Sequence, residues 1–167
     1  KLSEPMLQIR LANLKDLAAI TEIYNQAVLT TVASFDTEAK TLDEQQEWFF
    51  VHQGRLPLLV GELDGIIAGW ASLSPWSDRC AYEGTVENSV YVAKAFQGRG
   101  FGKQLLRTLI EIAQERELHT IIARIVTENT LSIQLHENFG FQHIGVMKEV
   151  GQKFSRWLDV CMMQLML

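Results

Sequence analysis

The chain has 167 residues, of which 47% are hydrophobic and 21% charged, a composition typical of an ordinary globular protein with one domain. Its net charge of −5 argues against nucleic acid or an anionic membrane as a partner, and no apolar run reaches the roughly 20 residues that span a bilayer. Cys80 and Cys161 lack disulfide or zinc spacing, and no secretion signal is recognisable, so we expect a cytoplasmic protein with reduced thiols.

Apolar residues alternate, run together or recur every three to four positions, and these patterns predict the strands and helices. Strands are expected at residues 7–11, 57–63, 66–73, 85–92, 120–126, 141–150 and 157–167. Helices are expected at residues 13–28, 41–51, 102–117 and 129–139. This order indicates a single α/β or α+β domain with a mixed sheet. Residues 1–5 are expected to be a tail or an artificial addition, which leaves 6–167 as the domain.

Local signals mark several ends of these elements. Thr41 and Glu44 have the spacing of a capping box, and Asp64-Gly65 is a hairpin-turn pair. The β-branched residues at 120–126 favour a buried strand with a parallel neighbour. The last two strands are expected to be joined by the Gly-Gln-Lys sequence at 151–153.

A glycine-rich stretch between the fourth strand and the third helix is the main sign of ligand binding. Gly98, Gly100 and Gly102 leave backbone N–H groups open to a ligand, and the helix N-terminus behind them favours an anion. The stretch differs from a P-loop, because Gln97 replaces the first glycine and Gln104 replaces the serine or threonine. Its spacing also differs from the dinucleotide fingerprint. Taken alone, it predicts either a phosphate cradle or a plain turn.

Two motifs narrow this choice. The pattern Q-x-x-G-x-G at 97–102, after a Val-Tyr-Val strand, resembles the acetyl-coenzyme A signature of the GNAT superfamily of N-acetyltransferases. Residues 129–141 match a second family motif, except that His136 stands in place of tyrosine. The stretch Thr85–Val92 and the ending at 156–165 are similar to the phosphinothricin and methionine sulfoximine acetyltransferase branch. The resemblance covers nearly the whole chain. It implies one GNAT-type α/β (α+β) domain with a mixed, mostly antiparallel central sheet flanked by helices.

The resemblance also implies acetyl-CoA as the co-substrate. The outer edge of the Val-Tyr-Val strand would bind the pantetheine amides as an added strand, and one N–H there would serve as oxyanion donor. The glycine stretch would hold the pyrophosphate, and Asn129 would bind the pantetheine arm. The expected cofactor-binding residues are Val90, Tyr91, Val92, Gln97, Gly98, Arg99, Gly100, Phe101, Gly102, Lys103, Asn129 and Ser132.

Glu87 and His136 are the candidate catalytic residues. Glu87 lies three residues before Val90, near the expected thioester, and would take the proton of the substrate amine, through water. His136 shares a helix face with Asn129 and Ser132, so it is expected to face the cofactor and to orient a water or protonate the leaving thiolate. The alternatives are a solvated strand-edge glutamate and a structural histidine. The other histidines show no metal-ligand spacing, and no metal is expected.

The acceptor pocket is expected near the loop before the fourth strand. Arg79 would bind a substrate carboxylate with its guanidinium fork, although a loop arginine without a role is the alternative. Tyr82, Thr85 and Phe35 are candidates for the pocket walls, and Phe35 could instead anchor its own loop. Trp76 and Trp157 are interpreted as packing or dimer contacts.

These observations predict a cytoplasmic acetyl-CoA-dependent N-acetyltransferase that acts on the α-amine of a small amino acid or analogue, of the phosphinothricin or methionine sulfoximine and sulfone type. Neither cysteine lies beside a base, so direct transfer is expected rather than an acyl-enzyme. The branch implies a homodimer. The alternatives are acetylation of a protein N-terminus or a polyamine, and a coenzyme A-binding sensor without catalysis.

Overall fold

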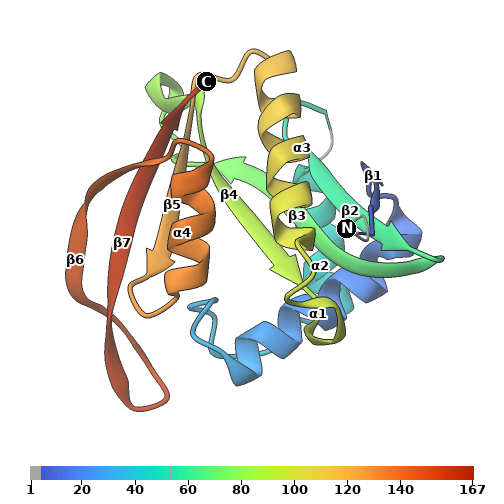
Figure 1. The fold of residues 1–167 in the computed structure, drawn as a ribbon, viewed down its shortest axis with the longest axis horizontal. Coiled ribbons are helices and arrows are strands. Elements are labelled where there is room, and N and C mark those ends of the chain that lie inside the picture. The colour runs from blue at the N-terminus through green and yellow to red at the C-terminus, as the bar shows by residue number, and fades with distance from the viewer. Residues whose placement is uncertain (1–4, 53) are drawn as a thin grey trace.

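The structure is a computed structural model that describes residues 5–52 and 54–167, and one sheet of seven strands organises it (Figure 1). The strands are β1 (Gln8–Leu11), β2 (Leu58–Leu63), β3 (Ile66–Pro75), β4 (Thr85–Val92), β5 (Thr120–Val126), β6 (Gln142–Lys153) and β7 (Arg156–Met166). They lie in the order β1-β2-β3-β4-β5-β7-β6, and neighbours are antiparallel except β4 and β5. The predicted mixed, mostly antiparallel sheet is therefore confirmed.

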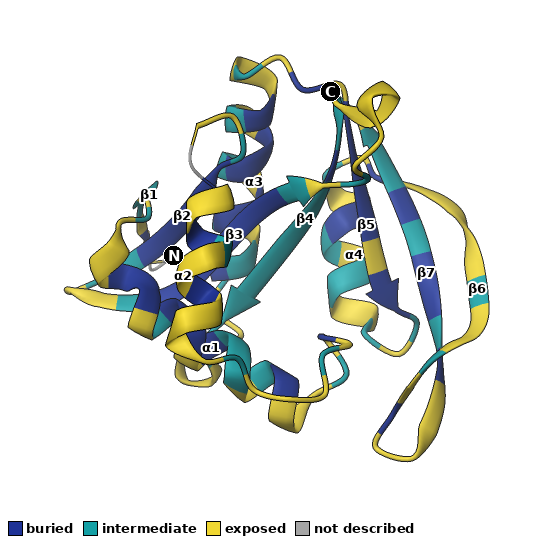
Figure 2. Ribbon diagram, turned by 180° about the vertical axis from the view of Figure 1, so that it is seen from behind, coloured by how far each residue is buried: buried dark blue, intermediate teal, exposed yellow. Residues whose placement is uncertain are grey.

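Four α-helices in the described part of the chain cover the two faces of this sheet. They are α1 (Leu17–Thr30), α2 (Leu42–Val51), α3 (Phe101–Glu115) and α4 (Thr130–Asn138). Views from opposite sides show α1 and α2 on one face and α3 and α4 on the other (Figures 1 and 2). None of the described helices combines the length and the apolar character needed to cross a membrane.

Each face of the sheet has its own apolar core. The stripe predicted for α3 is buried against one face, and its residues Leu105, Leu106 and Leu109 are fully inaccessible. Burial of such a stripe, rather than the intrinsic helix propensity, is what stabilises a helix of this length. On the other face, Ile20 of α1 packs in a smaller core with Trp70 of β3. The two cores thus pack β3 and β4 between α1 and α2 on one face and α3 and α4 on the other.

The only parallel pair among the described strands, β4 and β5, separates part of the way along. Its register runs from Thr85 opposite Thr120 to Glu87 opposite Ile122 and ends there. β4 stays paired with β3 up to Val92, so beyond Glu87 its other edge has no partner among the described strands. This gap places open backbone groups in the middle of the sheet.

Most local predictions agree with the structure, including the capping box. Thr41 N donates to Glu44 Oε2 at 2.7 Å, and Glu44 N donates to Thr41 Oγ1 at 3.2 Å. Asp64-Gly65 forms the β2–β3 turn, with φ angles of 51° and 80°.

The predicted connection between the last two strands is wrong. The Gly-Gln-Lys sequence at 151–153 lies within β6 and pairs with β7. The turn is formed by Phe154 and Ser155, whose φ angles are 51° and 58°. Two non-glycine residues occupy the left-handed region here, so the glycine was a misleading turn signal.

Candidate active site

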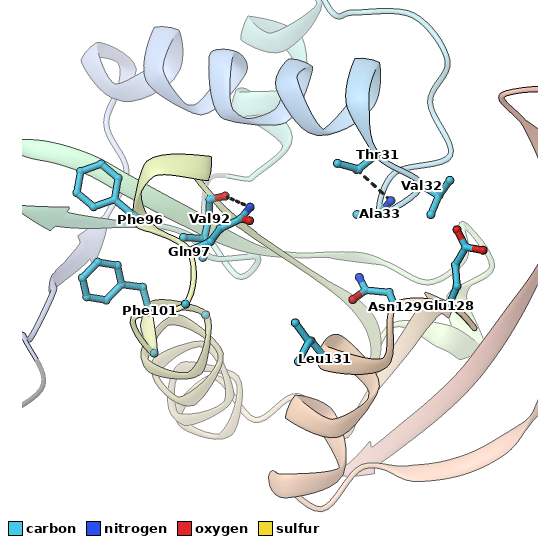
Figure 3. A pocket seen from close by; sticks show the side chains of 13 residues that line it. Thr31, Val32, Ala33, Val92, Phe96, Gln97, Phe101, Glu128, Asn129 and Leu131 are labelled. Atoms are coloured by element: carbon cyan, nitrogen blue, oxygen red, sulfur yellow. Dashed lines mark hydrogen bonds between the residues drawn. The ribbon is translucent and has the colours of Figure 1, made fainter.

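A cavity of about 540 Å³ lies where three loops meet (Figure 3). One wall is the segment 31–33, which follows α1. Another is the stretch 96–102, which leads into the first turn of α3 and of which every residue except Arg99 lines the cavity. Glu128, Asn129 and Leu131 close it at the start of α4, and Val92 lies at the end of β4. We call this space the first cavity.

The glycine stretch gives the first cavity the backbone geometry of an anion site. Gly98 and Gly100 have φ angles of 75° and 77°, in the left-handed region that favours glycine. Gly100 is the N-cap of α3 and offers no side chain to the first-turn amides. These amides and the positive end of the helix dipole are therefore free to bind a phosphate. The residues fit the pyrophosphate of acetyl-CoA.

Gln97 and β4 connect this cradle to the gap between the strands. The side-chain amide of Gln97 donates to the carbonyl oxygen of Val92 at 3.1 Å (Figure 3). The bond holds the glycine stretch against the end of β4, whose edge is open from Asn88 onward. An extended chain with amide groups, such as pantetheine, could add to that edge as a strand does.

Asn129 lies at the opposite wall and caps α4. Its Oδ1 accepts a hydrogen bond from Ser132 N at 3.3 Å, which leaves its amide NH₂ without a described partner. Ser132 itself does not line the cavity, and neither do Val90, Tyr91, Arg99 and Lys103. The expected cofactor residues that do line it are Val92, Gln97, Gly98, Gly100, Phe101, Gly102 and Asn129.

The wall at residues 31–33 has no counterpart in the sequence-based prediction. It is held from the β6–β7 hairpin, because the buried Lys153 donates from Nζ to the carbonyl oxygen of Ser34 at 2.6 Å. Phe35, in the loop after α1, packs against the same hairpin. A Cβ added at Gly151 would lie only 2.3 Å from its ring. This packing fits the alternative in which Phe35 anchors its own loop, and Phe35 does not line the first cavity. Only the fold brings these segments together.

Glu87 lies at the point where β4 and β5 separate. Its side chain is 21% exposed and forms a bidentate ion pair with Arg124 of β5, with 2.8 Å between Oε1 and Nη2 and a second bond from Nε to Oε2. This hydrogen bonding is the main cause that raises the pKa of Arg124. Trp76 lies against the guanidinium, with its ring centroid 5.4 Å from Cζ. Arg124 was not among the predicted residues.

His136 is buried, with only 4% of its surface exposed, and both ring nitrogens have partners. Nδ1 lies 2.7 Å from the carbonyl oxygen of Ser132, and Nε2 lies 2.9 Å from Nδ2 of Asn88. A carbonyl only accepts, so Nδ1 carries the proton and Nε2 accepts from the amide. Burial lowers the pKa of His136 and keeps the ring neutral. Its partner Asn88 lies at the open part of β4, and the ring itself does not line the first cavity.

The two predicted catalytic residues lie on opposite faces of the sheet. Successive side chains of a strand point to opposite faces, and Glu87 precedes Asn88, the partner of His136. Glu87 shares its face with Ser89 and Tyr91, toward α1 and α2. The structure therefore does not bring Glu87 and His136 into contact.

His52 and His136 predict a loss of stability in acid. Burial is the main cause that lowers the pKa of each ring below its ordinary value of 6.5. Below that pH the unfolded chain binds more protons than the folded chain, so stability falls as the pH falls. We expect the free energy of unfolding, from urea titrations, to be constant above pH 7 and to drop below pH 6.5 by up to about 1.4 kcal/mol per pH unit for each histidine. His136→Gln should flatten this slope, whereas His119→Gln, at an exposed position, should not.

The remaining acceptor candidates lie at or near the loop before β4. Arg79 caps the short turn Cys80–Tyr82, and its side chain has no partner among the described residues. Tyr82 is exposed on this turn. Thr85 starts β4, and its carbonyl oxygen accepts from Trp76 N at 3.2 Å. None of these residues lines either cavity.

A second cavity of about 180 Å³ lies on the Glu87 face of the sheet, between β3, β4 and the helices α1 and α2. Ser74 lines it and is the direct partner of Glu87 in the β3–β4 register. Tyr91 also lines it, and burial raises the pKa of this phenol to about 12. The buried Trp70 belongs to its wall, and the indole N–H has no partner in the described structure. Serine, charged and aromatic side chains line the cavity, and Ser74 places it beside Glu87.

Comparisons with known proteins agree with this geometry. Residues 9–162 match the acetyltransferase (GNAT) domain model. The chain is 43% identical to an L-methionine sulfoximine/L-methionine sulfone acetyltransferase of Salmonella typhimurium, covering 96% of this chain and 95% of that protein. It is 37% identical to a phosphinothricin N-acetyltransferase of Streptomyces coelicolor, with 92% of each covered. A Salmonella typhimurium acetyltransferase structure with its cofactor acetyl-CoA has a TM-score of 0.94, at 42% identity over 98% of this chain and 95% of that one.

Proposed function

Because the chain belongs to the GNAT acetyltransferase family, we propose that it transfers the acetyl group of acetyl-CoA to the α-amine of a small amino acid or analogue. The observation that carries this proposal is the first cavity, where the glycine stretch and the free amides of α3 suit a pyrophosphate. Relatives that act on methionine sulfoximine, methionine sulfone and phosphinothricin support a substrate of amino-acid type.

Glu87 is the proposed general base. Acetyl-CoA supplies a thioester carbonyl, and the substrate supplies an α-amine, which is mostly protonated at pH 7. Glu87 would remove that proton, directly or through water, on the face of the sheet that carries the second cavity. A backbone N–H on the open edge of β4 would stabilise the oxyanion. Transfer is proposed to be direct: the amine nitrogen bonds to the acetyl carbon, the carbon–sulfur bond breaks, and the coenzyme A thiolate takes up the second amine proton through water.

For His136 we propose a positioning role. Its Nε2 accepts a hydrogen bond, so it has no proton there to give to a leaving thiolate. The ring instead ties α4 to Asn88 at the open part of β4 and packs edge-on against Phe141 at 4.8 Å. His136 would thus hold the two walls of the gap at a constant separation.

A thiol-release assay with acetyl-CoA tests the proposed function. The acceptor panel contains methionine sulfone, methionine sulfoximine, phosphinothricin, proteinogenic amino acids, a peptide with a free N-terminus and a polyamine. We expect release with the amino acids and analogues. Preference for the peptide or polyamine would favour the alternative substrate classes, and coenzyme A binding without release would favour the sensor.

Arg79→Ala tests the predicted carboxylate contact in the loop before β4. If Arg79 binds the substrate carboxylate, we expect the KM for methionine sulfone to rise by about 10-fold or more, since a charged hydrogen bond contributes roughly 1.5–3 kcal/mol. The KM for an amine without a carboxylate should stay unchanged. Equal losses for both substrates would argue against carboxylate recognition by this residue.

We also propose that the enzyme is a cytoplasmic homodimer and that residues 6–167 form one domain. The exposed apolar side chains Ile144, Val146, Phe154 and Trp157 on the β6–β7 hairpin support a contact with a second copy. Light scattering coupled to gel filtration would measure the oligomeric state. Of the tail predicted at residues 1–5, only Pro5 is among the described residues. Its carbonyl oxygen accepts a hydrogen bond from Nε2 of Gln104 at 3.1 Å.

A further inference from the structure

The ion pair between Glu87 and Arg124 bridges the gap between β4 and β5. Glu87 is the last residue of β4 that pairs with β5, and Arg124 lies two residues beyond its partner Ile122. From there the Arg124 side chain reaches back across the gap and binds both carboxylate oxygens of Glu87. Each carboxylate oxygen of the proposed base thus accepts a hydrogen bond from the guanidinium.

This pair is open to a ligand. The Arg124 side chain is 52% exposed. Water reaches the guanidinium at this exposure and competes for its charge, so a second carboxylate can approach it and exchange with Glu87. Trp76 lies against the guanidinium at 5.4 Å from its ring centroid and keeps the planar group oriented while its partner changes.

The pair has the charge pattern that complements an α-amino acid. Such a substrate carries an ammonium and a carboxylate on one carbon, so it needs an anion and a cation side by side. Glu87 offers the anion and Arg124 the cation, 2.8 Å apart. Arg124 presents a rigid fork that matches a carboxylate with two parallel hydrogen bonds.

We propose that Arg124 is a specificity-determining residue, which exchanges Glu87 for the α-carboxylate of the acceptor and so frees Glu87 to receive the ammonium proton. This inference rests on the proposed function and names the group that selects amino acids over plain amines. The acceptor would bind with its carboxylate toward β5 and its amine toward β4. Arg79, in the neighbouring loop, has no described bond to Glu87, so a contact of Arg79 with the same carboxylate would not by itself release Glu87.

Two variants test this assignment with a matched pair of acceptors, methionine sulfone and its carboxamide. Arg124→Met removes the charge but keeps an unbranched apolar chain, and Arg124→Lys keeps the charge but removes the fork. With saturating acetyl-CoA, we expect Arg124→Met to raise the KM for methionine sulfone by about 10- to 100-fold, as for a lost charged hydrogen-bond pair. Its kcat/KM for the carboxamide should change by less than about 3-fold, and Arg124→Lys should fall between wild type and Arg124→Met.

Lys148→Met is the control, because it breaks another exposed ion pair, with Asp159 at 3.1 Å, away from both cavities. This variant should leave the KM and kcat/KM for both acceptors unchanged. If Arg124→Met lowered kcat/KM equally for the acid and the carboxamide, the proposal would be overturned, and Arg124 would serve only to position Glu87. Faster transfer to both would also overturn it and make Arg124 an inhibitor of the base. A wild-type enzyme that acetylates no amino acid would refute the proposed function itself.

Discussion

Glu87→Gln is expected to reduce kcat by about 10²- to 10⁴-fold, the range contributed by a general base. The amide cannot take a proton from the ammonium group, although it keeps the size of the side chain and one acceptor for Arg124. Glu87 does not line the first cavity, so the affinity for acetyl-CoA should not change. Steady-state kinetics over a range of pH, together with calorimetric titration of coenzyme A, measure both quantities.

Glu62→Gln is the matched control for this variant. Glu62 lies on β2, its side chain is 25% exposed, and it forms an ion pair with Arg10 at 3.2 Å. Like Glu87, it is therefore a partly buried strand glutamate paired with an arginine, but it does not line either cavity. The control should keep the wild-type kcat. If Glu87→Gln showed an unaltered rate over the whole pH range, Glu87 would have no part in the proton transfer.

Gly102→Ala is expected to raise the KM for acetyl-CoA by about 10- to 100-fold without unfolding the protein. An added Cβ would lie 3.8 Å from both Leu135 Cδ2 and Val92 Cγ2, an ordinary contact distance. Alanine also favours a helix over glycine by about 0.5–1 kcal/mol, so thermal stability should be equal or higher. Gly102 lines the first cavity, however, and a methyl group there would keep a pyrophosphate from the first-turn amides.

Gly145→Ala on β6 controls for the loss of a glycine, because a Cβ there meets no atom within 4 Å and its φ is not positive. It should preserve the KM for acetyl-CoA. Thermal unfolding and kinetics at varied acetyl-CoA concentration distinguish the two variants. An unchanged KM in Gly102→Ala would mean that the first turn of α3 does not hold the pyrophosphate.

Several features of the fold and site were predictable because their signals are local in the chain. The capping box at Thr41 depends on residues three positions apart, and the glycine stretch joins a strand directly to a helix. The family followed from the motifs at 97–102 and 129–141, and the comparisons confirm it. Asn129 and Gln97 line the same cavity, as those motifs implied.

Other features depend on which strand lies beside which. His136 has the helix position expected for a residue of the cleft, and its buried ring is bonded to Asn88 at the open part of β4. Phe35, a candidate either for the acceptor pocket or for anchoring its own loop, packs over Gly151, 116 positions away along the chain. Neither contact can be predicted from the spacing of residues along the chain, because each depends on the packing of distant segments.

By itself, the sequence determined the order of elements, the phosphate-binding stretch and the family, since each is encoded in periodicity or in short motifs. The tertiary structure decided what surrounds Glu87. β4 and β5 separate just after this residue, and the separation lets Arg124 reach across to it. The two residues are 37 positions apart along the chain, and only the parallel register of β4 and β5 places a guanidinium beside the carboxylate.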